Sequence, residues 1–164
     1  KMTESHKTRN DVLVNLAEQI RNENTRNYVF DRLMPQMEWY SGKGKECKKK
    51  YYRWMGVSIL LGALIPVVSV FADGAVWVKA LLADLGSAVT ACNAYAAIHN
   101  YKDLWITYRN TREKLLRFLY CYFHDAGVFS QEKTQGKKDA LLVKLCEEEM
   151  AGETAGWMSL MEKQ

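Results

Sequence analysis

The sequence predicts an all-α membrane protein, in which a two-transmembrane helical hairpin extends into a cytoplasmic helical bundle. Residues 54–72 form 19 consecutive positions without a charged side chain. As a helix they would span about 28 Å, close to the thickness of a bilayer's hydrocarbon layer. Residues 85–101 form a second uncharged stretch of 17 positions. We therefore place hairpin arms at about 54–72 and 75–101 in a single domain, with residues 1–53 and 102–164 as cytoplasmic helices.

Composition and motifs argue against several other classes of protein. The 164-residue chain has only two prolines and little period-two alternation, which favours long helices over sheet. Its first fifty residues are polar, so we expect no cleavable signal peptide. We find no Gly-rich phosphate loop and no Ser/His/Asp or Cys/His constellation, and we therefore expect neither enzymatic activity nor a cofactor.

Four cysteines are spaced too widely for a zinc site or a disulfide framework. No CxxC pair occurs, and no histidine lies at ligand spacing from any of them. We interpret them as unpaired thiols in a reducing compartment. They are Cys47, Cys92, Cys121 and Cys146.

The segment before the hairpin predicts two amphipathic helices. Apolar residues recur at helical spacing over residues 3–22, and the polar run NENTRN at 22–27 is expected to end that helix. Asn24 or Thr25 is the expected cap of the second helix. Pro35 is expected either to start a new helical segment or to kink this one, after which no strong stop signal occurs before residue 72.

Basic residues flank both arms, whereas the turn predicted at 72–75 carries none. Residues 43–53 hold six basic side chains and one acid, and residues 102–117 hold five basic side chains and two acids. The positive-inside rule therefore places both termini in the cytoplasm. The first basic run is followed by aromatics and a membrane-length segment, so we favour anionic lipid headgroups over nucleic acid as its partner.

The second arm carries one small and polar face when plotted at 100° per residue. This face consists of Lys79, Ala83, Gly86, Ser87, Thr90, Asn93, Ala94 and Ala97. Asp84 lies off its centre and is a candidate for charge selectivity, for pairing with Lys79 or for an interfacial position. The first arm carries a similar stripe of small residues, which we assign to hairpin packing. This stripe consists of Ser58, Gly62, Pro66 and Ser69.

Two interpretations of these faces remain open from the sequence. The stripes pack against each other, because small residues let helix backbones approach closely. Alternatively, the face of the second arm lines a water-filled pore, because polar groups within a membrane are costly unless they are paired or hydrated. Two helices alone cannot enclose an aqueous path, so a pore would require a homo-oligomer.

After the hairpin, the second arm is predicted to continue as one long helix well into the cytoplasm. Its helical spacing persists until a break at residues 125–127. A polar loop is predicted at 130–138, followed by an amphipathic helix over 141–161. The acidic run at 147–149 is interpreted as a solvated face of that helix.

Three segments of the chain are distinctive together with the hairpin: RLMPQMEWY at 32–40, DLWITYRNTREKLLRFLY at 103–120 and HDAGVF at 124–129. In this combination the chain resembles the SLATT-type two-transmembrane effector domains of bacterial conflict and defence systems. The resemblance runs from about Asn24 to Glu162. It implies a pore in the bacterial plasma membrane that depolarises or kills an infected cell, opened by a cytoplasmic partner or a nucleotide-derived signal. The central motif W-x-x-Y-R-x-T-x-E-x-L is matched by Trp105, Tyr108, Arg109, Thr111, Glu113 and Leu115.

This motif has a structural and a functional interpretation. Trp105 and Tyr108 would join the cytoplasmic helices, and Arg109 would pair with Glu113 one helical turn away. Alternatively, Arg109 or Arg112 contacts a regulatory ligand. The leading hypothesis is an oligomeric pore- or channel-forming effector. The alternatives are a non-conducting membrane-anchored module that recruits a cytoplasmic partner, and a soluble bundle that buries residues 54–72 internally.

Overall fold

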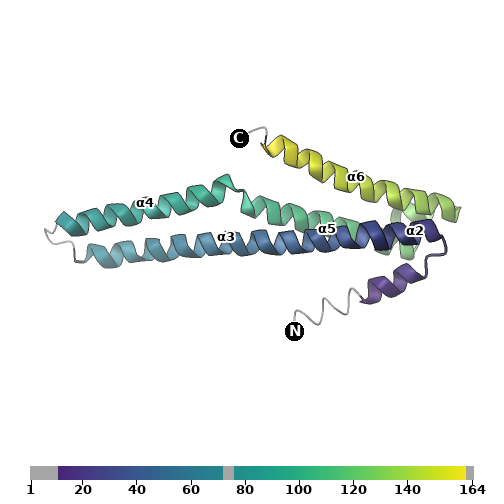
Figure 1. Ribbon diagram of the computed structural model, residues 1–164, viewed down its shortest axis with the longest axis horizontal. Coiled ribbons are helices and arrows are strands. Elements are labelled where there is room, and N and C mark those ends of the chain that lie inside the picture. Colours follow the sequence, from purple (N-terminus) through teal and green to yellow (C-terminus); the bar gives the residue numbers. More distant parts are fainter. Residues whose placement is uncertain (1–10, 72–75, 162–164) are drawn as a thin grey trace. The chain divides into compact units, whose positions relative to one another are not determined.

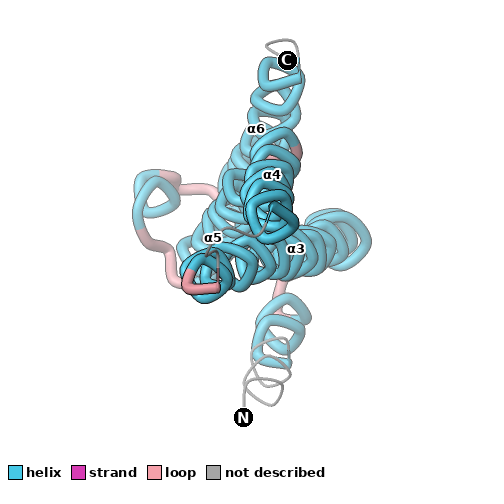
Figure 2. Tube along the Cα trace, turned by 90° about the vertical axis from the view of Figure 1, so that its left-hand side faces the viewer, coloured by secondary structure: helices cyan, strands magenta, loops and turns pink. Residues whose placement is uncertain are grey.

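The structure, a computed structural model, describes residues 11–71 and 76–161, with side chains described through residue 152 (Figure 1). Within those ranges all regular secondary structure is helical, as Figure 2 shows. The predicted all-α class is therefore confirmed. Residues 3–10 of the helix predicted over 3–22, and the turn predicted at 72–75, lie outside the described residues.

The first two helices are separated by a short break. Residues 11–18 are helical, and α2 (Glu23–Tyr28) begins after Asn22. The side-chain oxygen of Asn22 accepts a hydrogen bond of 3.1 Å from the backbone N–H of Asn24. Asn22 is therefore the N-cap, and the prediction of Asn24 or Thr25 is wrong because both already lie inside the helix.

A π-helical turn, η1 (Val29–Leu33), joins α2 to α3 (Met34–Ser69). Pro35 lies in the first turn of α3, where its missing N–H is tolerated. The wider π turn directly before α3 accommodates the hydrogen bond that the proline cannot form. α3 then continues for 36 residues through Gly42 and Pro66 without a stop, as predicted. The basic run and the uncharged run therefore belong to one helix.

The second arm ends earlier than predicted. α4 (Val76–Ile98) and α5 (Tyr101–Phe123) are separate helices, so the prediction of one continuous helix is wrong. Asn100 lies between them with φ +45°, a left-handed conformation that asparagine tolerates better than most residues. Its carbonyl accepts a hydrogen bond of 3.0 Å from the N–H of Leu104 and so starts α5.

The predicted break after α5 is confirmed. Asp125 and Gly127 both have positive φ, at +50° and +60°. A 3₁₀ turn, η2 (Gly127–Gln131), follows, and α6 (Gln135–Met161) completes the chain. The loop predicted over 130–138 is wrong in extent, because η2 and the first turn of α6 occupy most of it.

The chain divides into two compact units, which we call the bundle unit and the hairpin unit. The bundle unit comprises Lys1–Ser41 and Tyr108–Gln164, and the hairpin unit comprises Gly42–Thr107. The bundle unit has a closed apolar core. Its most deeply buried side chains are those of Val29, Leu33, Leu115, Leu119, Phe129, Leu142 and Cys146.

Candidate functional site

Within the hairpin unit, an apolar row of α4 lies against α3, and we call this interface the seam. Its partly or fully buried positions alternate in spacings of four and three, the pattern of two helices packed side by side. Rings of Trp54 and Tyr95 join the two helices, with centroids 4.7 Å apart. The α4 row consists of Val78, Leu82, Leu85, Val89, Cys92 and Ala96. The α3 row consists of Tyr51, Trp54, Ser58, Leu61, Ile65 and Val68.

The small and polar face of α4 lies away from the seam. Gly86 is half-buried, and the other members are exposed, as is Asp84. A Cβ atom added at Gly86 or Gly62 would meet no atom within 4 Å. Neither glycine therefore marks a close approach of two backbones within one hairpin. The exposed members are Lys79, Ala83, Ser87, Thr90, Asn93, Ala94 and Ala97.

Polar groups on this face differ in how they are satisfied. Ser87 Oγ donates to the carbonyl of Asp84 at 2.9 Å, and Thr90 Oγ1 donates to the carbonyl of Gly86 at 3.0 Å. These two hydroxyls are therefore satisfied within α4. Within residues 11–71 and 76–152, by contrast, the side chains of Lys79, Asp84 and Asn93 form no hydrogen bond or ion pair.

The small-residue stripe of α3 is only partly in the seam. Ser58 is buried, with 8% of its surface exposed, and Gly62 is half-buried. Pro66 and Ser69 are exposed, and Ser69 Oγ donates to the carbonyl of Pro66 at 2.7 Å. Larger side chains, such as Leu61, therefore fill most of the seam.

Two helical stretches are long and apolar enough to cross a membrane, one in α3 and one beginning in α4. Only 6% of the apolar stretch in α3 and 0% of that in α4 is buried inside the protein, whereas the core helix of a soluble protein would be mostly buried. The single chain therefore does not show the internal burial of residues 54–71 that the soluble-bundle alternative requires. Exposed large side chains here include Ile59, Leu60, Leu64, Val67, Val70, Phe71, Val76 and Trp77.

The predicted motif on α5 contributes mainly to packing. Tyr108, Thr111, Arg112 and Leu115 are buried along one face, and Arg109 is exposed. The Tyr108 ring packs edge-on against Trp39 and lies close to Tyr40, with centroids 5.6 Å and 6.0 Å away. In the hairpin unit, Trp105 is half-buried, and Lys48 Nζ lies 5.5 Å from its ring centroid. Glu113 pairs with Arg112, at 3.3 Å, instead of with Arg109.

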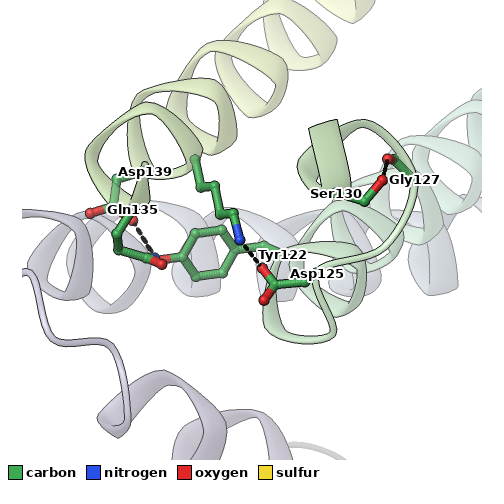
Figure 3. A network of polar contacts seen from close by, with 7 residues as sticks. Tyr122, Asp125, Gly127, Ser130, Gln135 and Asp139 are labelled. Carbon is green, nitrogen blue, oxygen red and sulfur yellow. Dashed lines mark hydrogen bonds and ion pairs between the residues drawn. The ribbon is translucent and has the colours of Figure 1, made fainter. Parts of the chain in front are cut away.

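A buried polar network in the bundle unit was not predicted from the sequence. Asp139 on α6 has 4% of its surface exposed. Its Oδ1 accepts hydrogen bonds from Tyr122 Oη (2.6 Å) and Gln135 Nε2 (3.0 Å), and its Oδ2 accepts one from Asn22 Nδ2 (2.9 Å). Figure 3 shows the Tyr122 ring reaching α6 beside Gln135 and Asp139. The pKa of the Tyr122 hydroxyl is raised, mainly because the group is buried and also because it donates to Asp139.

A second polar cluster joins α6 to the N-terminal helices. Glu147 accepts hydrogen bonds from Tyr28 Oη at 2.9 Å and from two nitrogens of Arg32, each at 3.2 Å. The Arg32 guanidinium is the main reason that the pKa of Glu147 is lowered. Glu149 pairs with Lys114 of α5 at 2.8 Å. Residues 147–149 are therefore at least partly exposed, as predicted, but two of the three glutamates also pair with other helices.

The four cysteines are free thiols, as predicted. Cys146 lies in the core of the bundle unit, where burial raises the pKa of its thiol to about 12. Among residues 11–71 and 76–161, no group of three His, Cys, Asp or Glu side chains is placed to hold a metal ion.

Comparison with known proteins identifies the family. Residues 35–137 match the family model described as "Protein of unknown function (DUF4231)". The chain belongs to the DUF4231 family. The matched region contains most of α3, the hairpin and all of α5, and it stops at the start of α6. Neither the curated proteins nor the solved structures gave a match.

Proposed function

We propose that this DUF4231 protein is an oligomeric pore- or channel-forming effector of the bacterial plasma membrane, with both termini in the cytoplasm. It acts in antiviral defence without enzymatic chemistry, and a cytoplasmic partner or nucleotide-derived signal gates it. The two long apolar helices support the membrane location. The residues that resemble SLATT-type effector domains support the role in defence.

One observation carries the proposal of a pore: the polar face of α4 is exposed and lies about a third of a helical turn away from the seam. α3 packs only against the apolar side of α4. The side chains of Lys79, Asp84 and Asn93 therefore have no hydrogen-bond or ion-pair partner among the described residues. In a bilayer, such groups need water or another polar group. A ring of hairpins with the polar face turned inward would supply water to Lys79 and Asn93, whereas Asp84, nine residues from Asn93, projects from the other side of α4.

The exposed apolar side chains of α3 suit the outer wall of such a ring. Leu60 and Ile59 are 69% and 62% exposed in the single chain. Contact with lipid tails would remove this surface from water. α3 would then face lipid, and α4 would face the ion pathway.

Ion flux through liposomes containing the purified protein tests the proposal. Replacing the amide by an alkyl group in Asn93→Leu should reduce or abolish flux, because the ion pathway loses a hydrated polar group. Leu60→Ala on the outer wall is the control and should conduct like the unchanged protein. Absence of flux under every trigger would refute the pore, and equal flux in both variants would refute the position of Asn93 on the ion pathway.

A second candidate function, a non-conducting membrane anchor that recruits a cytoplasmic partner, has one observation in its favour. The hydroxyls of Ser87 and Thr90 bond to carbonyls of their own helix and therefore need no water. Under this proposal, Asn93→Leu is tolerated in the cell, whereas charge reversal at exposed Arg109 abolishes partner binding. Co-purification of partner with each variant distinguishes the two functions.

A further inference from the structure

A pocket in the hairpin unit lies where the basic part of α3 meets the junction of α4 and α5. It has a volume of about 290 Å³. Three helices line it, and none of the lining residues is acidic. They are Lys50, Arg53, Trp54 and Val57 of α3, Tyr95 of α4 and Tyr101 of α5.

Aromatic rings form one side of this pocket and continue past it. Trp54 contacts Tyr95, and the ring of Tyr95 lies 4.2 Å from that of His99. His99 stacks on Tyr101 at 5.2 Å and 20°, across the break at Asn100. His99 Nδ1 lies 3.0 Å from the carbonyl oxygen of Tyr95, which holds the imidazole in the row. The pocket wall therefore spans both helices at the break.

The two cations of the pocket are not equally engaged. Lys50 Nζ lies 2.8 Å from Glu46 and 5.9 Å from the Tyr101 ring centroid. Glu46 also accepts from Lys43, so the single acid of this basic run is shared. Arg53 forms no ion pair within the described part of the chain. Its guanidinium offers paired N–H donors, the geometry that suits phosphate oxygens.

The pocket also stands at a sharp change in polarity along α3. Arg53 is the last charged residue before the uncharged run, and Trp54 and Val57 follow within one helical turn. A ligand held here would have its anionic group beside Arg53 and Lys50 and an apolar group beside Val57. A phospholipid has both parts in this order, with its phosphate at the depth where basic and aromatic residues gather.

We propose that this pocket binds the phosphate group of an anionic phospholipid headgroup, with Arg53 and Lys50 as its cationic contacts and Trp54, Tyr95 and Tyr101 as its wall. Because α3, α4 and α5 all line the pocket, a bound headgroup ties α3 to both sides of the break at Asn100. The inference rests on the membrane location in the proposed function, and not on conduction.

Thermal unfolding of the full-length protein in neutral detergent tests this proposal. The probes are dihexanoyl-phosphatidylglycerol, dihexanoyl-phosphatidylcholine and two soluble phosphates, glycerol 3-phosphate and adenosine monophosphate. Phosphatidylglycerol should raise the unfolding temperature in a saturable manner, since a ligand of the folded state stabilises it. The zwitterionic lipid and the soluble phosphates should have little effect at equal concentration.

Arg53→Gln is the decisive variant, and Lys49→Gln is its matched control. Lys49 is a neighbouring exposed cation that does not line the pocket. Arg53→Gln should raise the half-maximal phosphatidylglycerol concentration about tenfold or more, because it removes hydrogen bonds from a charged donor. Lys49→Gln should behave like the unchanged protein. Arg53→Lys should be intermediate.

Several outcomes would overturn the proposal. An equal loss of phosphatidylglycerol affinity in Arg53→Gln and Lys49→Gln would mean that the lipid is attracted to the whole basic run and does not bind at one site. An equal response to phosphatidylcholine would remove the role of anionic charge. A response to soluble phosphate alone would keep the phosphate contact but replace lipid as its source. Flux of the same protein in liposomes separates the two proposals, since selective lipid binding without conduction refutes the pore and leaves the pocket.

Discussion

The bundle unit buries its large apolar side chains, whereas the hairpin unit leaves many of its own exposed. In the bundle unit, residues such as Leu33, Leu115 and Leu142 have 0% of their surface exposed. In the hairpin unit, Leu60, Val70 and Trp77 have 69% or more exposed. The first unit therefore gains its hydrophobic stabilisation within one chain in water, whereas the second needs a membrane or further copies for the same gain.

Matched leucine truncations in the two units should have the largest and most unequal effects. Leu142→Ala removes a fully buried side chain and should destabilise the bundle unit by about 2–5 kcal/mol. Leu60→Ala removes an exposed one and should have little effect in detergent. Denaturant unfolding of both variants checks this, and equal losses would contradict the contrast between the units.

Loss of the buried carboxylate in the bundle unit should come next in size. Asp139→Leu leaves Asn22, Tyr122 and Gln135 without their shared acceptor and should cost about 1–3 kcal/mol. Tyr122→Phe removes one donor and should cost about 1 kcal/mol. The same unfolding measurement checks both. A fully stable Asp139→Leu variant would show that this network contributes nothing to the bundle.

The Arg32–Glu147 pair should give a smaller, pH-dependent effect. Because Arg32 lowers the folded-state pKa of Glu147, the pair's contribution is complete above the unfolded-state value of about 4.3 and is lost as pH falls through the lower folded-state pKa. The side chains are 57% and 41% exposed, so the contribution should stay below about 1 kcal/mol. Unfolding midpoints measured between pH 6 and 3 check this. They should depend less on pH in Arg32→Gln than in the unchanged protein, whereas Lys144→Gln, which breaks the neighbouring exposed pair with Glu148, should keep the full dependence.

The polar face of α4 should affect folding least and selectivity most. Asp84→Asn changes an exposed side chain without partners among the described residues, so it should alter stability by less than about 0.5 kcal/mol. If Asp84 is the selectivity charge of the proposed pore, its replacement removes that carboxylate and should lower the preference for cations. Reversal potentials in asymmetric salt measure this, with Asp103→Asn as a control outside α4. Unchanged selectivity in Asp84→Asn would exclude it as a selectivity charge.

Local sequence predicted the helices well, because uncharged length and helical spacing determine them directly. It did not predict the break at Asn100. The residues around that position keep helical spacing and include no proline or glycine, so only the left-handed asparagine and the stack of His99 on Tyr101 mark it. The residues of the α4 polar face could be identified from the sequence. The side of α4 against which α3 packs could not, since it depends on the surfaces of both helices.

The buried network shows a different limit of sequence reasoning. Asn22 and Asp139 lie 117 positions apart, and no local pattern links them. One signal was present: Asp139 continues the buried row of Leu142, Cys146 and Met150 on α6. An acidic residue in line with core positions indicates a carboxylate that must find donors, because an unsatisfied buried charge is very costly.

The π-helical turn at Val29–Leu33 sets the rotational phase of the N-terminal helices. Buried residues recur every four positions from Thr25 through Val29 and Leu33 to Met37, a spacing that would drift around an ordinary α-helix. The wider turn reduces this drift and keeps the row aligned with the core. Deleting one residue here would rotate everything upstream by about 100°. Among relatives, gaps of a single residue at this turn should therefore be accompanied by compensating changes in the residues that face α6.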